Sequence, residues 1–379
     1  MVLSPGERCG EKYRGLHRVL EGRRGHAVNQ LDATYLARAV ELAARALADT
    51  APNPPVGAVI VRGERTLGEG WHHRKGQPHA EAEALRIARE AGEDVRGATM
   101  YVTLEPHDHE STMPRCSVAI IDAGIERVVV GALDPNQLTH GKGVARMRSA
   151  GVAVEVADDA PCRALIERFA FTIGSTLPYV TLKMAMSLDG FIAPYPGTYR
   201  VTGEAARERV YDLRAEHDAV MVGAGTVRAD DPLLTVRPHR SRAKPYARVV
   251  VSGSAPLAPT YRVFAEPAGA PPGSYAPTIV LAPERGARDV DLRGALAGLR
   301  AAGITSVLCE GGPALAGNLL AAGLVERVVW FVAPAFLRTP EAVPVLAGAD
   351  LRAMLTGWTF DEVERVGDDL MITAKLPHV

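Results

Sequence analysis

The sequence predicts an α/β protein of two domains, and three observations support this. The chain has 379 residues, which is more than one small core usually organises. Hydrophobic residues make up 47% and charged residues 23%, which is typical of globular proteins and excludes wholesale disorder or a fibrous repeat. Segments with strand and helix patterns alternate along the chain, which predicts helices packed on the faces of a sheet.

Charge and cysteine content exclude several classes of function. Lys and Arg total 43 against 44 Asp and Glu, so the excess positive charge needed for general nucleic-acid binding is missing. Four cysteines are too few and too scattered for a disulfide framework, which indicates a reducing cytoplasm. The charged N-terminal segment does not resemble a signal peptide, and no apolar run approaches the ~20 residues of a membrane span. We therefore expect a soluble cytoplasmic protein without nucleic-acid or membrane partners.

The first alternating set predicts a three-layer domain. Residues 1–30 are rich in Gly and Arg without periodicity, which predicts a poorly ordered extension. Apolar residues then recur at helical spacing from Ala33 to Ala48, with Asp32 as the expected N-cap. The remaining elements are expected at strand Val56–Val61, helix Ala80–Ala91, strand Thr99–Leu104, helix Cys116–Ala123 and strand Arg127–Val130.

The alternation restarts after a junction near residue 175, which divides the chain into domains of residues 31–175 and 176–379. Strands are expected at Tyr179–Met184, Ala219–Val222, Ala247–Val251, Thr278–Leu281, Ser306–Cys309 and Val328–Val332, with helices at Glu204–Glu216 and Ala314–Ala322. The Pro- and Gly-rich stretch Pro256–Pro277 is expected to be loop. The two sets share no obvious repeat, so we expect two different domains.

Three candidate metal ligands lie in the first domain. His79 stands at an expected helix start, and His107 and Cys116 follow an expected strand. Two imidazoles and a thiolate leave the fourth tetrahedral position of zinc for water, and Glu81 is the adjacent carboxylate that is not a ligand. This layout is typical of zinc-dependent nucleobase deaminases, in which metal-activated water attacks the amino-bearing ring carbon and a Glu shuttles protons.

Five short runs carry a family resemblance in this domain. They are Asn53–Gly57, Gly68–His72, Pro78–Glu81, Val102–Pro106 and Asp134–Asn136. In order and spacing they resemble the deaminase half of the bifunctional deaminase/reductase family of riboflavin biosynthesis, and the resemblance covers residues 33–379. It implies a cytidine-deaminase-like fold and pyrimidine contacts for Asn53 and His72. The family closes its zinc site with two cysteines nine residues apart, whereas this chain has His107 in place of the first.

Two interpretations of His107 are open. Either its ring nitrogen completes a His-His-Cys zinc site, or the metal site has decayed, as in relatives that act only as reductases. His109 is an alternative donor. The small, basic segment that the family places before Cys116 is replaced by Glu110–Thr112, which would be unfavourable for a substrate phosphate.

A second group of motifs lies in the second domain. They are Lys183–Gly190, Val201–Gly203, Val222–Val227, Asp230–Arg237 and Glu310–Pro313. A glycine pair that ends a strand and opens a helix lets backbone N–H groups approach a pyrophosphate. The set resembles the reductase half of the same family, which implies a dihydrofolate-reductase-like fold and NADPH as cofactor.

That resemblance also implies roles for individual residues. The dinucleotide would contact Ala185, Arg200, Thr202, Thr226, Asp230, Gly312, Pro313, Ala314, Leu315 and Gly317. The phosphoribosyl substrate would meet Thr198, Arg214, Leu234, Arg237 and Glu310. Lys183 and Asp231 are the catalytic candidates and Glu310 is an alternative proton donor, although Asp231 also suits a turn or cap. Arg200 replaces the family's Trp, which would weaken stacking on the cofactor.

The sequence therefore predicts a bifunctional riboflavin-pathway enzyme. It would deaminate a diaminopyrimidine ribosyl phosphate with zinc and Glu81, and then reduce the ribosyl group to ribityl with NADPH. The alternatives are a reductase with an inactive deaminase domain, a diverged relative acting on another aminopyrimidine in specialised metabolism, and a scaffold that keeps only the fold. The resemblance also suggests a homo-oligomer.

Overall fold

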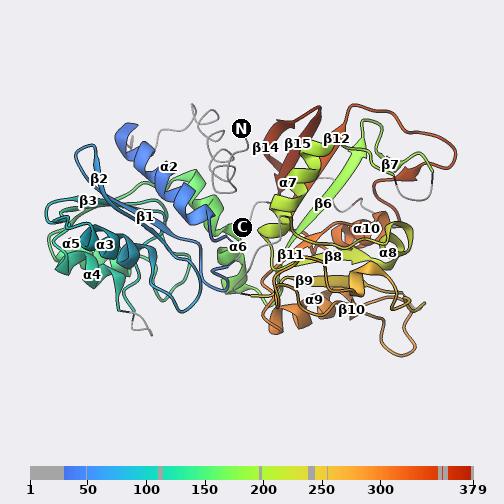
Figure 1. Cartoon of the computed structure of the whole chain (residues 1–379), viewed down its shortest axis with the longest axis horizontal. Coiled ribbons are helices and arrows are strands. Elements are labelled where there is room, and N and C mark those ends of the chain that lie inside the picture. The colour runs from blue at the N-terminus through green and yellow to red at the C-terminus, as the bar shows by residue number, and fades with distance from the viewer. Residues whose placement is uncertain are drawn as a thin grey trace. The chain divides into compact units, whose positions relative to one another are not determined.

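The computed structural model describes residues 30–47, 49–109, 114–195, 199–237, 244–253, 255–348, 352 and 357–376. Apart from residue 30, the predicted N-terminal extension lies outside these residues. The chain divides into two compact units, the first ending at Gly174 and the second beginning at Ser175 (Figure 1). Within the described residues, no helix has the length and apolar character required to cross a membrane.

The first unit is built on a five-stranded mixed sheet with strand order β2-β1-β3-β4-β5. The strands are β1 Gly57–Arg62, β2 Arg65–Trp71, β3 Thr99–Val102, β4 Arg127–Val130 and β5 Ala153–Val156. β1 runs antiparallel to both β2 and β3, whereas β3, β4 and β5 are parallel. The carboxyl ends of β3 and β4 therefore lie at the same edge of the sheet, where the loops that follow them can meet.

Helices cover both faces of this sheet because alternate strand residues point to opposite sides. The helices are α2 Gln30–Ala44, α3 Ala80–Glu90, α4 Cys116–Asp122, α5 Lys142–Ser149 and α6 Ala160–Gly174. Ile60 and Met100 belong to a core with α3, α4 and α5, whereas their neighbours Val59 and Tyr101 belong to a core with α2 and α6. This arrangement confirms the predicted three-layer α/β domain.

The predicted N-cap role of Asp32 is wrong. Asp32 lies inside the first turn of α2 and is 2% exposed. Its carboxylate accepts a 2.6 Å bond from the Tyr101 hydroxyl and pairs with both terminal nitrogens of Arg127 at 2.7 and 2.8 Å. A partly buried ion pair with Arg127, which is 95 residues away in the chain, therefore takes the place of the local cap.

The second unit contains an eight-stranded sheet of order β10-β9-β8-β11-β6-β12-β15-β14 and a separate two-stranded sheet, β13-β7. The strands are β6 Tyr179–Ser187, β7 Phe191–Ala193, β8 Ala219–Gly223, β9 Ala247–Val251, β10 Ile279–Leu281, β11 Ser306–Cys309, β12 Arg327–Ala333, β13 Val343–Pro344, β14 Thr359–Val366 and β15 Asp369–Lys375. The first six strands of the large sheet are parallel, and β15 and β14 close one edge as an antiparallel pair.

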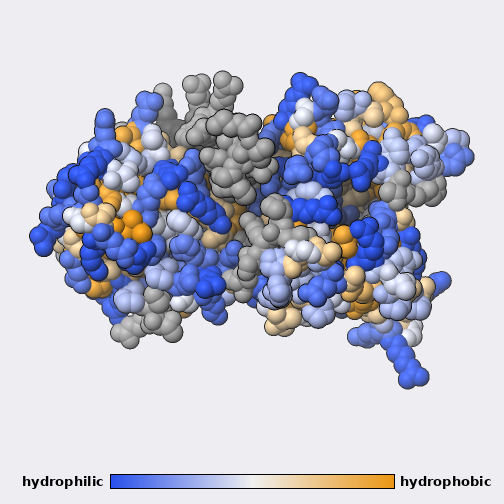
Figure 2. All heavy atoms as spheres, in the orientation of Figure 1, coloured by the Kyte–Doolittle hydropathy of each residue, from blue (hydrophilic) through white to orange (hydrophobic). Residues whose placement is uncertain are grey.

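Helices again pack on both faces of the large sheet. They are α7 Glu204–Ala215, α8 Ala224–Asp230, α9 Leu292–Ala301 and α10 Pro313–Ala321, with a short 3-10 turn, η2 Arg262–Phe264, inside the predicted loop. Leu182 and Val307 share a core with α9 and α10, whereas Leu308 and Phe331 pack with α7 on the other face. Figure 2 shows a largely hydrophilic surface in this view, with apolar residues in small separate areas.

Several elements were not predicted. They include strand β2, helices α5, α6, α8 and α9, and the β14–β15 hairpin. β14 has a mostly exposed burial pattern, with Phe360 and Val363 at 78% and 59% exposure. An edge strand that buries neither face lacks the alternation by which strands are recognised.

Candidate functional site

The first candidate site is a cavity of about 340 Å³ in the first unit. Its wall includes the predicted residues Asn53, His72, His79, Glu81 and His107. His79 occupies the position just before α3, and Cys116 is the first residue of α4. His107 follows β3 by five residues, so the ligand candidates come from three separate segments that the sheet brings to one place.

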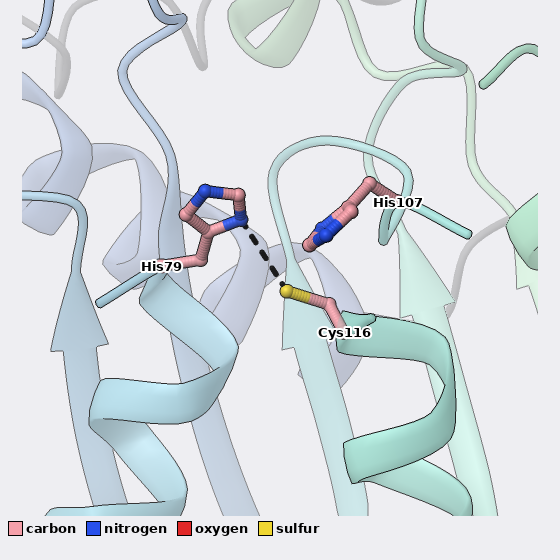
Figure 3. A group of neighbouring side chains, drawn as sticks. All are labelled: His79, His107 and Cys116. Carbon is pink, nitrogen blue, oxygen red and sulfur yellow. Dashed lines mark hydrogen bonds between the residues drawn. The ribbon is translucent and has the colours of Figure 1, made fainter. Parts of the chain in front are cut away.

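His79, His107 and Cys116 form a compact donor set. Their candidate ligand atoms all lie within 4.8 Å of one another, and the side chains point toward a common centre (Figure 3). The Cys116 Sγ to His79 Nδ1 distance is 3.4 Å. In a zinc tetrahedron with Zn–S of ~2.3 Å and Zn–N of ~2.0 Å, those two atoms would be about 3.5 Å apart. The residues present therefore fit zinc, with His107 in the place of the family's cysteine.

The ionisation of these groups follows from burial. Burial lowers the pKa of His79 to about 4, and the neighbouring imidazoles of His107 and His72 add to the decrease. The imidazole of His79 is therefore neutral at pH 7, as a metal ligand must be. Burial also raises the pKa values of the Cys116 thiol and the Glu81 carboxyl. A bound divalent cation reverses this effect for the thiol, since coordination removes its proton.

His72 and Asn53 are positioned by each other. The Nδ1 atom of His72 lies 3.0 Å from the carbonyl oxygen of Pro78, and its Nε2 atom lies 3.2 Å from the amide nitrogen of Asn53. A carbonyl only accepts, so Nδ1 carries the proton and Nε2 accepts from Asn53. Burial lowers the pKa of His72, which agrees with this neutral tautomer. The pair holds the Asn53 amide in a fixed orientation beside the cavity.

Glu105 holds together the loops around this cavity. Its carboxylate accepts bonds from four backbone N–H groups, those of Asp134, Gly141, Gly143 and Val144, at 2.9 to 3.3 Å. Gly143 is required at this approach, because a Cβ there would lie 1.9 Å from the Pro106 carbonyl oxygen. The segment of His107 and the loop before α5 are thereby packed closely together.

Sequence reasoning missed part of the cavity wall. Phe169 of α6 and Thr139 line it, and Thr139 Oγ1 lies 3.3 Å from His109 Nδ1. No local motif marks Phe169, because only the packing of α6 on the sheet brings it to the cavity. His109 also lines the cavity, but it is not a member of the three-residue donor set. The segment Glu110–Thr112 lies outside the described residues.

The second candidate site is a buried ionic network in the second unit. Arg214, in the last turn of α7, forms a two-point pair with the carboxylate of Glu310, which follows β11. Its Nη1 atom also donates to the carbonyl of Thr235 at 2.9 Å. Lys183 of β6 places its Nζ atom 4.0 Å from Glu310 Oε2. Three residues that are far apart in the sequence thus share one charge cluster.

The pKa values in this network are coupled. Burial lowers the pKa of Lys183, although the Glu310 carboxylate opposes that decrease. Burial also acts against ionisation of Glu310, but Arg214 and Lys183 outweigh it and lower the pKa of Glu310. Arg214 keeps its charge, because its pKa is raised by Glu310 in spite of burial.

The predicted cofactor residues near α10 are close together. Gly311 has φ of 82°, a left-handed conformation, and a Cβ there would lie 2.9 Å from Met184 Sδ. A Cβ at Gly312 would lie 3.2 Å from Thr226 Oγ1, so Thr226 adjoins the glycine turn. Gly312 and Pro313 begin α10, where backbone N–H groups favour a phosphate. This glycine cradle fits the pyrophosphate of NADPH.

Other predicted residues lie elsewhere in the second unit. The guanidinium groups of Arg237 and Arg214 lie 5.6 and 5.7 Å from the ring centre of Tyr211, which links them. Asp231 ends α8 with φ of 40°, and its carboxylate accepts a 2.7 Å bond from the Arg262 backbone N–H. Leu234 is buried, whereas Asp230 and Arg200 are exposed. Thr198 lies outside the described residues.

The two halves also match known families. Residues 29–132 match the cytidine and deoxycytidylate deaminase zinc-binding region, and residues 178–372 match the RibD C-terminal domain. A riboflavin biosynthesis protein RibD from Aquifex aeolicus is 36% identical over 365 residues, covering 92% of this chain and 99% of that protein. The chain belongs to the RibD family.

RibD proteins of other bacteria give the same result. The Escherichia coli RibD is 36% identical, over 90% of this chain and 98% of its own length. The Acinetobacter baumannii RibD structure superposes with a TM-score of 0.75 at 33% identity, over 92% of this chain and 99% of that one. The Thermotoga maritima deaminase/reductase structure superposes with a TM-score of 0.80 at 33% identity, over 91% and 99%. The RibD family and the fold predicted from the sequence are therefore confirmed, and the chain is a bifunctional deaminase and reductase.

Proposed function

We propose that the first unit deaminates a diaminopyrimidine ribosyl phosphate and that the second then reduces its ribosyl group to ribityl with NADPH. The Thermotoga maritima relative is described as a diaminohydroxyphosphoribosylaminopyrimidine deaminase and 5-amino-6-(5-phosphoribosylamino)uracil reductase. The observation that carries the proposal here is the His79, His107 and Cys116 donor set inside a cavity that also contains Glu81. The relatives carry both halves and give no support to the alternatives of a reductase alone, another aminopyrimidine or a scaffold.

In the deaminase site, His79, His107 and Cys116 would hold zinc. Zinc supplies a Lewis acid that makes water nucleophilic at neutral pH. Glu81, 3% exposed and on the first turn of α3, accepts the water proton at its carboxylate and returns it to the leaving amino group. Asn53, held by His72, orients the pyrimidine edge.

In the reductase site, Lys183 and Glu310 would face the ribosyl carbon and its ring oxygen. Lys183 would donate a proton to the ring oxygen as the C1–O bond breaks and C1 accepts a hydride supplied by NADPH, and Glu310 would favour the charged form of Lys183. Arg214 donates hydrogen bonds to Glu310 and to the carbonyl of Thr235, and it would thereby orient the Glu310 carboxylate. The exposed guanidinium of Arg237 would bind the substrate phosphate. Thr226 and the turn from Gly312 to Gly317 would hold NADPH. A role for Asp231 in catalysis stays a prediction, as do the roles of Thr198, Leu234, Ala185, Thr202 and Arg200.

One assay of purified protein tests the proposal. The diaminopyrimidine ribosyl phosphate is supplied with NADPH, and ammonia release and NADPH oxidation are followed together, alongside zinc content by elemental analysis. About one zinc per chain with both activities is expected. NADPH oxidation only on the deaminated intermediate, without bound zinc, would contradict the deaminase proposal.

The domain limits of 31–175 and 176–379, the cytoplasmic location and a homo-oligomeric state belong to the same proposal. Light scattering coupled to gel filtration measures the assembly directly. A monomer at micromolar concentration would contradict the oligomer.

A further inference from the structure

Asp108 lies between two segments that carry metal ligands. It directly follows His107, and its side chain is 11% exposed. Asp108 Oδ1 accepts a 2.6 Å hydrogen bond from the hydroxyl of Ser117, which directly follows Cys116. One side-chain bond therefore joins the residues next to two of the three ligands.

A backbone bond runs parallel to this contact. The Ser117 N–H donates to the carbonyl oxygen of His107 at 3.3 Å. Ser117 itself is fully buried, so its hydroxyl needs a partner within the protein. Together the two bonds fix the start of α4 against the segment of His107 without any contribution from a metal.

A third element secures the same carboxylate. Arg146 of α5 pairs through its Nε atom with Asp108 Oδ1. The charge of Asp108 is thereby neutralised by a guanidinium. The carboxylate thus connects the His107 segment to both α4 and α5.

These contacts matter because a metal site tolerates errors of only about 0.2 Å in its ligand distances. Without the brace, the metal itself would have to hold the segment of His107 and the start of α4 at ligand distance. The conformational entropy lost on ordering these segments would then be subtracted from the affinity for zinc.

We propose that Asp108 is a positioning residue for the zinc site, which braces His107 and Cys116 at ligand distance through Ser117 and Arg146. The inference rests on the proposed zinc site, and it assigns to Asp108 a role in metal affinity and not in the chemical step. Groups that orient metal ligands typically change affinity by about 10- to 100-fold when they are removed. Because Asp108 acts through the neighbours of the ligands, we expect about tenfold.

The test measures zinc affinity of the full chain by competition with a chelator of known affinity. Asp108→Ala should bind zinc about tenfold more weakly than the native protein, and its cobalt-substituted form should show altered visible absorption bands, since these report ligand geometry. Ser117→Ala, which removes only the hydroxyl, should weaken zinc binding in the same direction. Asp108→Asn keeps an oxygen acceptor for Ser117 and should stay within about threefold of the native affinity.

Glu93→Ala is the matched control. Glu93 pairs with Arg65 in the same unit, and neither residue lines the cavity. The control should bind zinc with native affinity. Native affinity and an unchanged cobalt spectrum in both Asp108→Ala and Ser117→Ala would overturn the brace. If Asp108→Ala does not fold, Ser117→Ala decides alone. A native protein that binds no zinc would instead refute the proposed zinc site.

Discussion

The deaminase cavity is lined by His72 and His79, imidazoles that burial keeps neutral, whereas the reductase site contains Lys183, Arg214 and Glu310 as a cluster of charges. In the first unit the imidazoles are neutral, so a bound metal would supply the positive charge of the site. In the second unit the charges compensate one another within the protein. The first site therefore depends on a bound cation for its positive charge, whereas the second site carries its own balanced charges.

The largest expected effect is on deamination in the first unit. Glu81→Gln should leave zinc bound, because Glu81 is not a ligand, and should slow ammonia release by about 10²- to 10⁴-fold. NADPH oxidation on the deaminated intermediate should be unchanged, which serves as the internal control. Deamination at the native rate would assign the proton transfer to another group.

The next effect concerns the charge cluster of the second unit. Glu310→Gln removes the negative member and leaves Lys183 and Arg214 buried without compensation, which should destabilise that unit by about 3 to 5 kcal/mol. Hydrogen exchange measured by mass spectrometry should show faster exchange in β6 and β11 and native exchange in β1 and β3. The exposed Glu284→Gln is the matched control. An equally stable Glu310→Gln protein would break the distinction between the two sites.

Glu326 is a second buried carboxylate in the same unit, and its pKa differs from that of Glu310. Its hydrogen-bond donor is a backbone N–H group, whereas Glu310 pairs with the guanidinium of Arg214. The Oε2 atom of Glu326 accepts from the Val180 N–H at 2.7 Å, and burial raises the pKa of Glu326 to about 7. The folded state therefore holds a proton that the unfolded state releases at lower pH. Stability from this group is present below about pH 4.5 and is lost as the pH rises through about 7.

The Glu326→Gln variant tests this pH dependence. At pH 8 it should be more stable than the native protein by up to about 3 kcal/mol, at roughly 1.4 kcal/mol per pKa unit. The gain should disappear below about pH 4.5, where the native side chain is protonated in both the folded and the unfolded state. Urea unfolding of both proteins across this pH range provides the measurement. A gain that does not change with pH would contradict the raised pKa.

The smallest effect is that of metal removal on stability. Zinc at 100 times its dissociation constant should stabilise the first unit by about 2.7 kcal/mol over the metal-free form. Chelation should therefore lower the unfolding temperature of the first unit and leave that of the second unchanged. Scanning calorimetry with and without chelator measures both unfolding temperatures. A decrease confined to the second unit would contradict the assignment of zinc to the first unit.

Much of the protein follows from local sequence. The alternation of strand and helix patterns and the donor types at His79, His107 and Cys116 were sufficient to predict an α/β protein and a zinc site in its first half. These features can be recognised in the sequence because strand and helix periodicities repeat within a few residues, and because the ability to bind zinc depends on residue type.

Other features were decided only by tertiary structure. The ion pairs of Asp32 with Arg127 and of Arg214 with Glu310 join residues that are 95 and 96 positions apart, and the sequence did not predict them. It also did not predict that Phe169 lines the deaminase cavity or that Ser117 donates a hydrogen bond to Asp108. Each of these contacts depends on how helices and strands pack against one another, and the secondary-structure propensity of a segment does not determine this packing. Buried polar groups take the partners that packing places within reach, since an unpaired buried charge is more costly than a lost local preference.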